Sequence, residues 1–121
     1  MDDLGNEKIR IAVASSDGIV VNEHFGRTEK FYIYDSDEEE LNLVEIRNVT
    51  RVCELGNHDD DRLRENAETI SDCQYLLVSR IGQGASQVVE SLGVEPYEIP
   101  GIITESIEQL IKYRKLQALF A

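Results

Sequence analysis

Apolar and polar positions alternate along the first part of the chain and predict three β-strands. In residues 8–14, isoleucine and valine alternate with arginine and alanine, the two-residue period of a strand. Residues 30–34 are aromatic and β-branched, which favours a second strand. Residues 41–49 form the third, and a slip in their apolar phase between Leu43 and Val44 predicts a β-bulge. The acidic residues 35–40 are interpreted as the solvated tip of a hairpin rather than a cation site.

In the second half of the chain, helical and strand patterns alternate. Two short apolar runs, 74–79 and 94–99, predict strands, and the first reads as a central strand buried on both faces. Gly93 is placed to end the helix between them. Apolar residues at three- and four-residue spacing predict amphipathic helices over 60–71, 82–92 and 104–120. The predicted order is therefore β-β-β-α-β-α-β-α.

This order predicts an α/β fold with a five-stranded mixed sheet and helices on both faces. We expect the strand order 3-2-1-4-5 with only strand 2 antiparallel, which is the ribonuclease-H-like topology. Residues 8–121 then form one domain after a disordered leader of residues 1–7. Ligands of open α/β sheets bind beyond the carboxyl ends of the strands. Here that edge carries the loops 15–29, 50–59, 79–84 and 100–103.

Possible metal ligands fall on these loops. His24 lies on the first loop, and Cys53 and His58 lie on the second. Imidazole and thiolate groups bind iron or zinc. Two other interpretations stay open, because Cys53 could be a small buried hydrophobe and His58 could cap the following helix or lie in solvent. Cys73, directly before the central strand, is expected to be a packing residue.

Groups suited to an anion lie on the same predicted edge. Arg27 and Arg80 are two of only twelve basic residues in the chain. They could face an anionic ligand or pair with neighbouring carboxylates. Gly82 and Gly84 open a predicted helix, where they could supply turn geometry or leave free amides for an anion.

Composition and missing motifs narrow the function. The formal charge of −12 argues against nucleic acid or an anionic membrane as the main partner. No apolar stretch approaches the roughly 20 residues that span a bilayer, and two cysteines make no disulfide framework. We therefore expect a soluble cytoplasmic protein with reduced thiols. The sequence shows no phosphate loop, dinucleotide-binding glycine motif or nucleophile–base arrangement, so we expect no enzyme activity.

The chain contains Val21-Asn22-Glu23-His24-Phe25-Gly26 and, further along, Arg80-Ile81-Gly82-Gln83-Gly84. In this order and at this separation, the two motifs resemble the dinitrogenase iron–molybdenum cofactor biosynthesis family, which includes NifX and the NifX-like C-terminal domain of NifB. Further matching stretches extend the resemblance over about residues 8 to 119, nearly the whole chain. Some relatives have an aspartate directly before the histidine, where this chain has Glu23.

The resemblance implies a ribonuclease-H-like fold and a small carrier. Its cargo would be an iron–sulfur precursor of the nitrogenase cofactor, the NifB-derived cluster, passed between donor and acceptor proteins of cofactor assembly. The resemblance makes His24 the proposed cluster ligand and Cys53 a plausible second one. The cysteines of a radical-SAM domain are absent, so this chain would not build the cluster. The alternative is a regulatory or protein-interaction module of the same fold; the sequence does not specify an oligomeric state.

Overall fold

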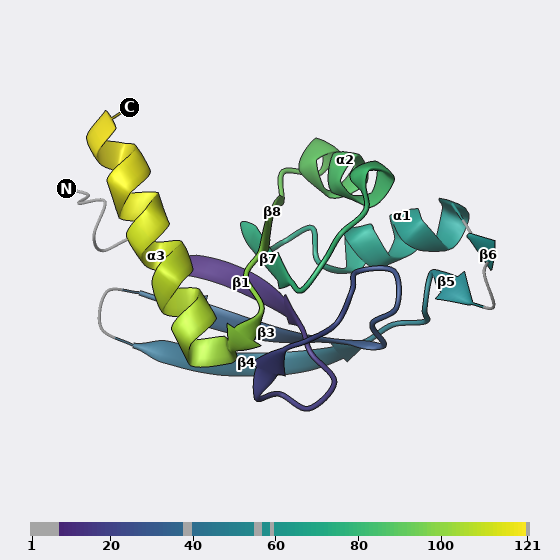
Figure 1. Cartoon of the computed structure of the whole chain (residues 1–121), viewed down its shortest axis with the longest axis horizontal. Coiled ribbons are helices and arrows are strands. Elements are labelled where there is room, and N and C mark those ends of the chain that lie inside the picture. Colours follow the sequence, from purple (N-terminus) through teal and green to yellow (C-terminus); the bar gives the residue numbers. More distant parts are fainter. Residues whose placement is uncertain (1–7, 38–39, 55–56, 59, 121) are drawn as a thin grey trace.

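A computed structural model describes residues 8–37, 40–54, 57–58 and 60–120 (Figure 1). Within these residues the predicted mixed five-stranded sheet and three helices are present. The sheet strands are β1 (Ile9–Ala14), β3 (Lys30–Ser36), β4 (Leu41–Asn48), β7 (Tyr75–Val78) and β8 (Glu95–Glu98). The helices are α1 (Asp60–Thr69), α2 (Gln83–Ser91) and α3 (Ile103–Phe120). The predicted leader, residues 1–7, lies outside the described residues.

The sheet order is β4-β3-β1-β7-β8, which in chain order of these five strands is 3-2-1-4-5. Strand β3 is antiparallel to both of its neighbours, whereas β1, β7 and β8 are parallel. The carboxyl ends of β1, β7 and β8 therefore lie at one edge, where the loops that follow them meet. The ribonuclease-H-like label stays a prediction.

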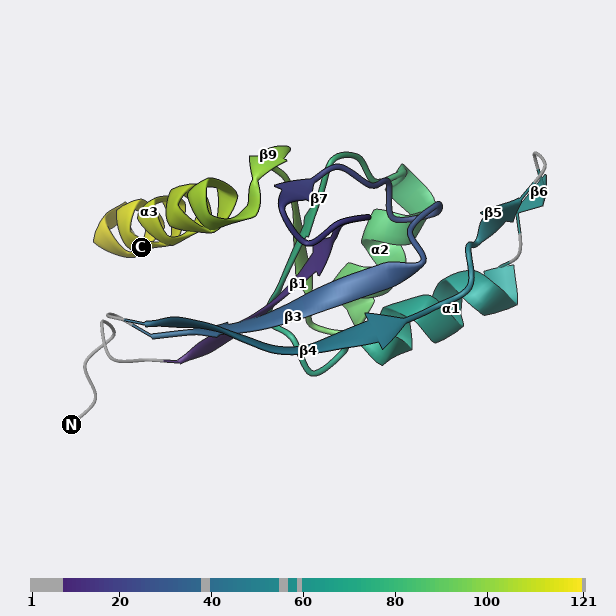
Figure 2. The same cartoon turned by 90° about the horizontal axis from the view of Figure 1, so that it is seen from below.

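Helices cover both faces of this sheet (Figures 1 and 2). Because neighbouring strand residues point to opposite faces, Ala12 and Leu76 pack with α1 and α2. Val13 and Leu77, one position further along, pack with α3. The small side chain of Ala12 leaves room for helices to lie close to β1.

Two local predictions are confirmed. In the β3–β4 pair, Ile33 lies opposite Glu45 and Tyr34 lies opposite Leu43, so Val44 is the extra residue of a bulge. Gly93, with a φ of 88°, follows the C-terminus of α2 in a conformation that favours glycine.

Two short strand pairs were not predicted, because two residues are too few to show a period. Strand β2 (Val20–Val21) pairs with β9 (Gly101–Ile102), and β5 (Cys53–Glu54) pairs with β6 (Asn57–His58). The first pair fastens the loop after β1 to the start of α3. There the Ile103 amide donates to the Ile19 carbonyl oxygen at 2.9 Å.

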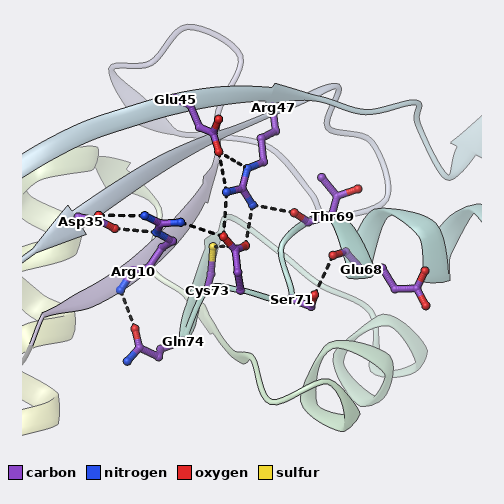
Figure 3. Close-up of polar contacts among 10 residues, drawn as sticks. Arg10, Asp35, Glu45, Arg47, Glu68, Thr69, Ser71, Cys73 and Gln74 are labelled. Atoms are coloured by element: carbon purple, nitrogen blue, oxygen red, sulfur yellow. Dashed lines mark hydrogen bonds and ion pairs between the residues drawn. The ribbon is translucent and has the colours of Figure 1, made fainter.

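A charged network joins β1, β3 and β4 to the turn before β7 (Figure 3). Arg10 binds both carboxylate oxygens of Asp35, at 2.8 and 3.0 Å, and reaches Asp72 at 2.9 Å. Arg47 binds both oxygens of Asp72, at 2.7 and 2.9 Å, and donates to the carbonyl of Thr69 at the end of α1. Hydrogen bonds from Arg47 and Arg10 hold the pKa of Asp72 well below its usual range.

Cys73 lies beside this network and is 3% exposed. Burial, with the charge of Asp72 adding to it, raises the pKa of its thiol to about 12. The residue packs among the core side chains between the sheet and α1, as expected from its position.

Candidate functional site

The loop that carries His24 is hydrogen-bonded to the residues that directly follow β7. His24 forms a parallel bridge with Arg80. Around it, the Phe25 amide donates to the Arg80 carbonyl at 3.1 Å, and the Ser79 amide donates to the Glu23 carbonyl at 3.0 Å. The two sequence motifs, more than fifty positions apart, are thus neighbours in the fold.

Local structure fixes the backbone of His24 and leaves its side chain exposed. Its carbonyl oxygen accepts hydrogen bonds from the amides of Arg27 and Thr28, both at 3.0 Å. Phe25, the next residue, is fully buried, with its ring 5.8 Å from that of Phe31. The apolar ring therefore anchors the loop, and the imidazole before it is held at the surface.

The loop after β4 is joined to the same turn. The Val52 amide donates to the Gly26 carbonyl at 3.0 Å, and the Val52 side chain is buried. Cys53 follows directly and pairs in register with His58 across the β5–β6 hairpin. The backbone thus brings the two predicted loops together, whereas the side chains of Cys53 and His58 lie outside the described part of the structure. Both remain predicted ligands.

An open pocket of about 700 Å³ lies where these loops meet the first turn of α2. Five of the six residues predicted to bind a cofactor line it: His24, Arg27, Arg80, Gly82 and Gly84. The other lining residues are Gly26, Val52, Leu63, Ile81, Ala85 and Glu98. The pocket thus combines an apolar floor from buried Val52, Leu63 and Ala85 with polar groups from two loops.

The glycines at the start of α2 leave the pocket open. A Cβ atom on Gly82 or Gly84 would meet no atom of the described chain within 4 Å. Gly82 has a φ of −71°, which any residue adopts, so turn geometry does not require it. Gly82 makes no side-chain cap, and the first amides of a helix have no partner within it. The start of α2 at the edge of the pocket therefore has backbone donors that the helix itself does not use.

Arg27 and Arg80 supply positive charge to the pocket. Both are exposed, and no carboxylate of the described residues lies within ion-pair distance of either guanidinium. Arg10 and Arg47, by contrast, are both paired with Asp72. The alternative that Arg27 and Arg80 pair with neighbouring carboxylates is therefore wrong for the described part of the chain.

Glu98 is a pocket residue that sequence reasoning missed. Its carboxylate accepts a hydrogen bond from the Ile81 amide at 2.9 Å, across a separation of 17 residues. It thereby holds the backbone between Arg80 and Gly82. In the sequence it is an ordinary polar residue at a strand end, and no local pattern marks it.

The donor set fits a ligand that brings most of its own coordination. No three His, Cys, Asp or Glu side chains among those described are grouped as a metal site. His24 is the one nitrogen ligand suited to a transition metal among the described pocket side chains. An iron–sulfur cluster carries its own bridging sulfides, so each iron needs fewer ligands from the protein than a bare metal ion does.

Comparison with known families decides where this fold belongs. Residues 7–113 match the family described as dinitrogenase iron-molybdenum cofactor. The chain belongs to this family. The matched range contains every residue that lines the pocket of this family member. None of its described helices is both long and apolar enough to cross a bilayer.

Curated relatives of this family member are named FeMo cofactor biosynthesis protein NifB, Protein NifX and Protein NifY. It is 35% identical to the FeMo cofactor biosynthesis protein NifB of Frankia alni over 107 residues, 86% of this chain. It is 28% identical to Protein NifX of Azotobacter vinelandii over 84% of this chain and 65% of NifX. The chain spans about a fifth of the length of the NifB relative, since the match covers 21% of it.

Solved structures share the fold. The crystal structure of PH0822 has a TM-score of 0.67 at 24% identity, over 86% of this chain and 90% of that one. An NMR structure of a Thermotoga protein has a TM-score of 0.61 at 23% identity, over 86% and 88% of the two chains. At these identities the likeness shows the fold alone.

Proposed function

We propose that this protein is a small, non-enzymatic carrier that binds an iron–sulfur precursor of the nitrogenase iron–molybdenum cofactor and passes it on during cofactor assembly. One observation carries the proposal. One pocket is lined by the exposed His24, by Arg27 and Arg80, which have no ion-pair partner among the described residues, and by the first residues of α2. The NifB and NifX names of its relatives support the choice of the NifB-derived cluster as cargo.

The donor set suits transfer rather than permanent storage. Four cysteine thiolates make a resident iron–sulfur site, whereas one imidazole, with Cys53 as a second ligand, leaves iron positions free for an acceptor. His24 is exposed on a fixed backbone, so a receiving protein can reach the bond that must be exchanged. His58, the register partner of Cys53, is an accessory candidate for the same role.

Charge must be compensated locally, because cluster and protein are both anionic. The chain has a formal charge of −12, which opposes an anionic cluster at long range. Within the pocket, Arg27, Arg80 and the amides at the start of α2 oppose that effect, since a helix N-terminus favours an anion. Glu98 is the carboxylate of the lining, and its bond to the Ile81 amide keeps it engaged with the protein.

The carrier would work between a donor and an acceptor protein of nitrogenase cofactor assembly, in the cytoplasm. The competing function is a regulatory or protein-interaction module of the same fold that binds no cluster. The two functions differ in one measurable property, which is whether isolated NifB-derived cluster binds to the purified chain.

The test is anaerobic mixing of the protein with isolated NifB-derived cluster, followed by gel filtration with iron quantification. We expect iron to comigrate with the unmodified protein and to be reduced at least tenfold with His24→Ala. Arg80→Ala should also reduce the bound iron, because it removes positive charge from the pocket. Arg64→Ala, which removes an exposed arginine outside the pocket, is its matched control and should bind as the unmodified protein does. Absence of iron on the unmodified protein would support the interaction module instead. Unchanged binding by His24→Ala and Cys53→Ala would refute the site.

A further inference from the structure

Exposed apolar side chains gather along α3. Nine large apolar residues are exposed in the described part of the chain, and four of them lie on this helix: Tyr113, Leu116, Leu119 and Phe120. Two more, Ile19 and Ile102, lie beside its first residue. Leu119 and Phe120 are 76% and 86% exposed, and Ile19 is 63% exposed. An apolar surface at both ends of one helix marks an interaction surface.

The two sides of α3 differ. Ile103, Ile107 and Leu110 are buried against the sheet. In Figures 1 and 2, no described helix or strand covers the other side, and the C-terminal end projects beyond the sheet. The outer side therefore has no partner within the described chain.

Charges follow an ordered pattern along this outer side. Glu105, Glu108, Lys112 and Lys115 are spaced by three, four and three residues, and Leu119 continues the series. Residues at this spacing lie along one stripe of the helix surface. All four charged side chains are exposed, and none has an ion-pair partner among the described residues.

We propose that α3 is the interface of a homodimer, in which it lies antiparallel to α3 of a second copy across a two-fold axis. In that arrangement Glu105 lies opposite Lys115 of the second copy, and Glu108 lies opposite its Lys112. Each pair occurs twice, because a two-fold interface is self-complementary. Leu119 then lies opposite Gly101, next to the exposed Ile102. The hydrogen bond from the Ile103 amide to the Ile19 carbonyl keeps Ile19 beside the start of α3, close to Ile102.

The order of charges makes α3 complementary to a second copy of itself. The carboxylates come first along the helix and the amines second, which matches the same helix running the other way. Residues 109–120 contain three basic residues and no acidic one, so this half-helix is locally positive in a chain of charge −12. No residue of α3 lines the pocket that contains His24. Both pockets of the dimer therefore stay open.

Sedimentation equilibrium of the purified full chain across a wide concentration range tests this proposal. We expect a species of twice the 13.7 kDa of one chain. The double variants Lys112→Glu with Lys115→Glu, and Glu105→Lys with Glu108→Lys, should each be monomeric because like charges then face each other. A mixture of the two variants should form a heterodimer. Circular dichroism checks that each variant is folded.

Two results would overturn the proposal. One is a single-chain mass for the unmodified protein at every concentration, which would assign the apolar surface to a different partner. The other is a dimer that survives both charge reversals but dissociates with Leu43→Ser and Ile46→Ser. That result would place the interface on the exposed apolar residues of β4 instead.

Discussion

The Phe25 amide donates a hydrogen bond of 3.1 Å to the carbonyl oxygen of Arg80. This bond connects the turn that carries His24 to the segment between β7 and α2. Because the Phe25 ring is fully buried against Phe31, the turn is held by the core as well as by its backbone. The position of the pocket's imidazole therefore depends on a buried residue that does not line the pocket.

Replacing that buried anchor should loosen the site. Phe25→Ala should lower the free energy of unfolding by about 3–5 kcal/mol, as expected for deleting a buried ring. The milder Phe25→Leu should keep the fold and weaken cluster binding, because the His24 turn loses its packing. Urea unfolding and anaerobic binding titrations measure the two effects. Ile107→Val, in the core on the opposite face of the sheet, is the control, because it removes buried volume far from the His24 turn and should leave affinity unchanged; an equal loss of affinity would refute the role of Phe25.

Gly84→Ala separates stability from binding. Alanine favours a helix over glycine by up to about 1 kcal/mol, so thermal unfolding should occur at the same or a higher temperature. The added methyl group would enter the open space at the start of α2 and should reduce cluster affinity. Gly93→Ala provides the opposite control, since its φ of 88° makes alanine strained while the pocket lies elsewhere. Unchanged cluster affinity in Gly84→Ala would show that the ligand does not occupy the open space at the start of α2.

The charged network predicts a loss of stability in acid. Arginine hydrogen bonds lower the pKa values of Asp72 and Asp35 in the folded state. Their contribution is therefore present above the unfolded pKa of about 4 and is lost as the pH falls towards the folded values. Asp72→Asn should cost about 1 kcal/mol at pH 7, discounted for its exposure, and should flatten the decline below pH 4.

Urea unfolding between pH 7 and pH 2 measures this effect. Glu68→Gln is the control, because it removes a carboxylate from an exposed pair on α1. Its cost should stay below about 0.5 kcal/mol. An acid profile of Asp72→Asn that matches the unmodified protein would show that the network does not govern the decline.

The buried thiol of Cys73 should be unreactive in the native protein. With a pKa of about 12, only about 10⁻⁴ of this thiol is ionised at pH 8, and the thiolate is the reactive form. The variant Cys53→Ser, which leaves Cys73 as the one cysteine, should bind no Ellman reagent until urea is added. Rapid labelling of that native variant would contradict the burial of Cys73.

Regular elements could be predicted from this sequence because their periods extend over enough residues. Alternation was sufficient to predict β1, the aromatic and β-branched run of β3 and the slip at Val44 indicated the β3–β4 hairpin, and Gly93 marked the end of α2. The pair β2–β9 could not be found, since two residues carry no period. The predicted strand order also indicated that the loops carrying His24 and Arg80 lie together, because both loops follow parallel strands of one sheet.

Side-chain partners could not be predicted in the same way. Arg27 and Arg10 are both arginines near acidic residues in the sequence, yet Arg10 binds Asp72, 62 positions away, and Arg27 binds no carboxylate among the described residues. Glu98 was missed for the same reason, since its bond to Ile81 is made through the tertiary fold. Pairing depends on distances of a few ångströms, which the order of residues does not contain.

The most direct test of the central claim is pulsed EPR of the bound NifB-derived cluster in a paramagnetic state. If His24 is a ligand, the spectrum should show coupling to an imidazole nitrogen. That coupling should disappear in His24→Gln and persist in His58→Gln, which tests the only other histidine of the chain. A nitrogen coupling that persists unchanged in His24→Gln would contradict the account.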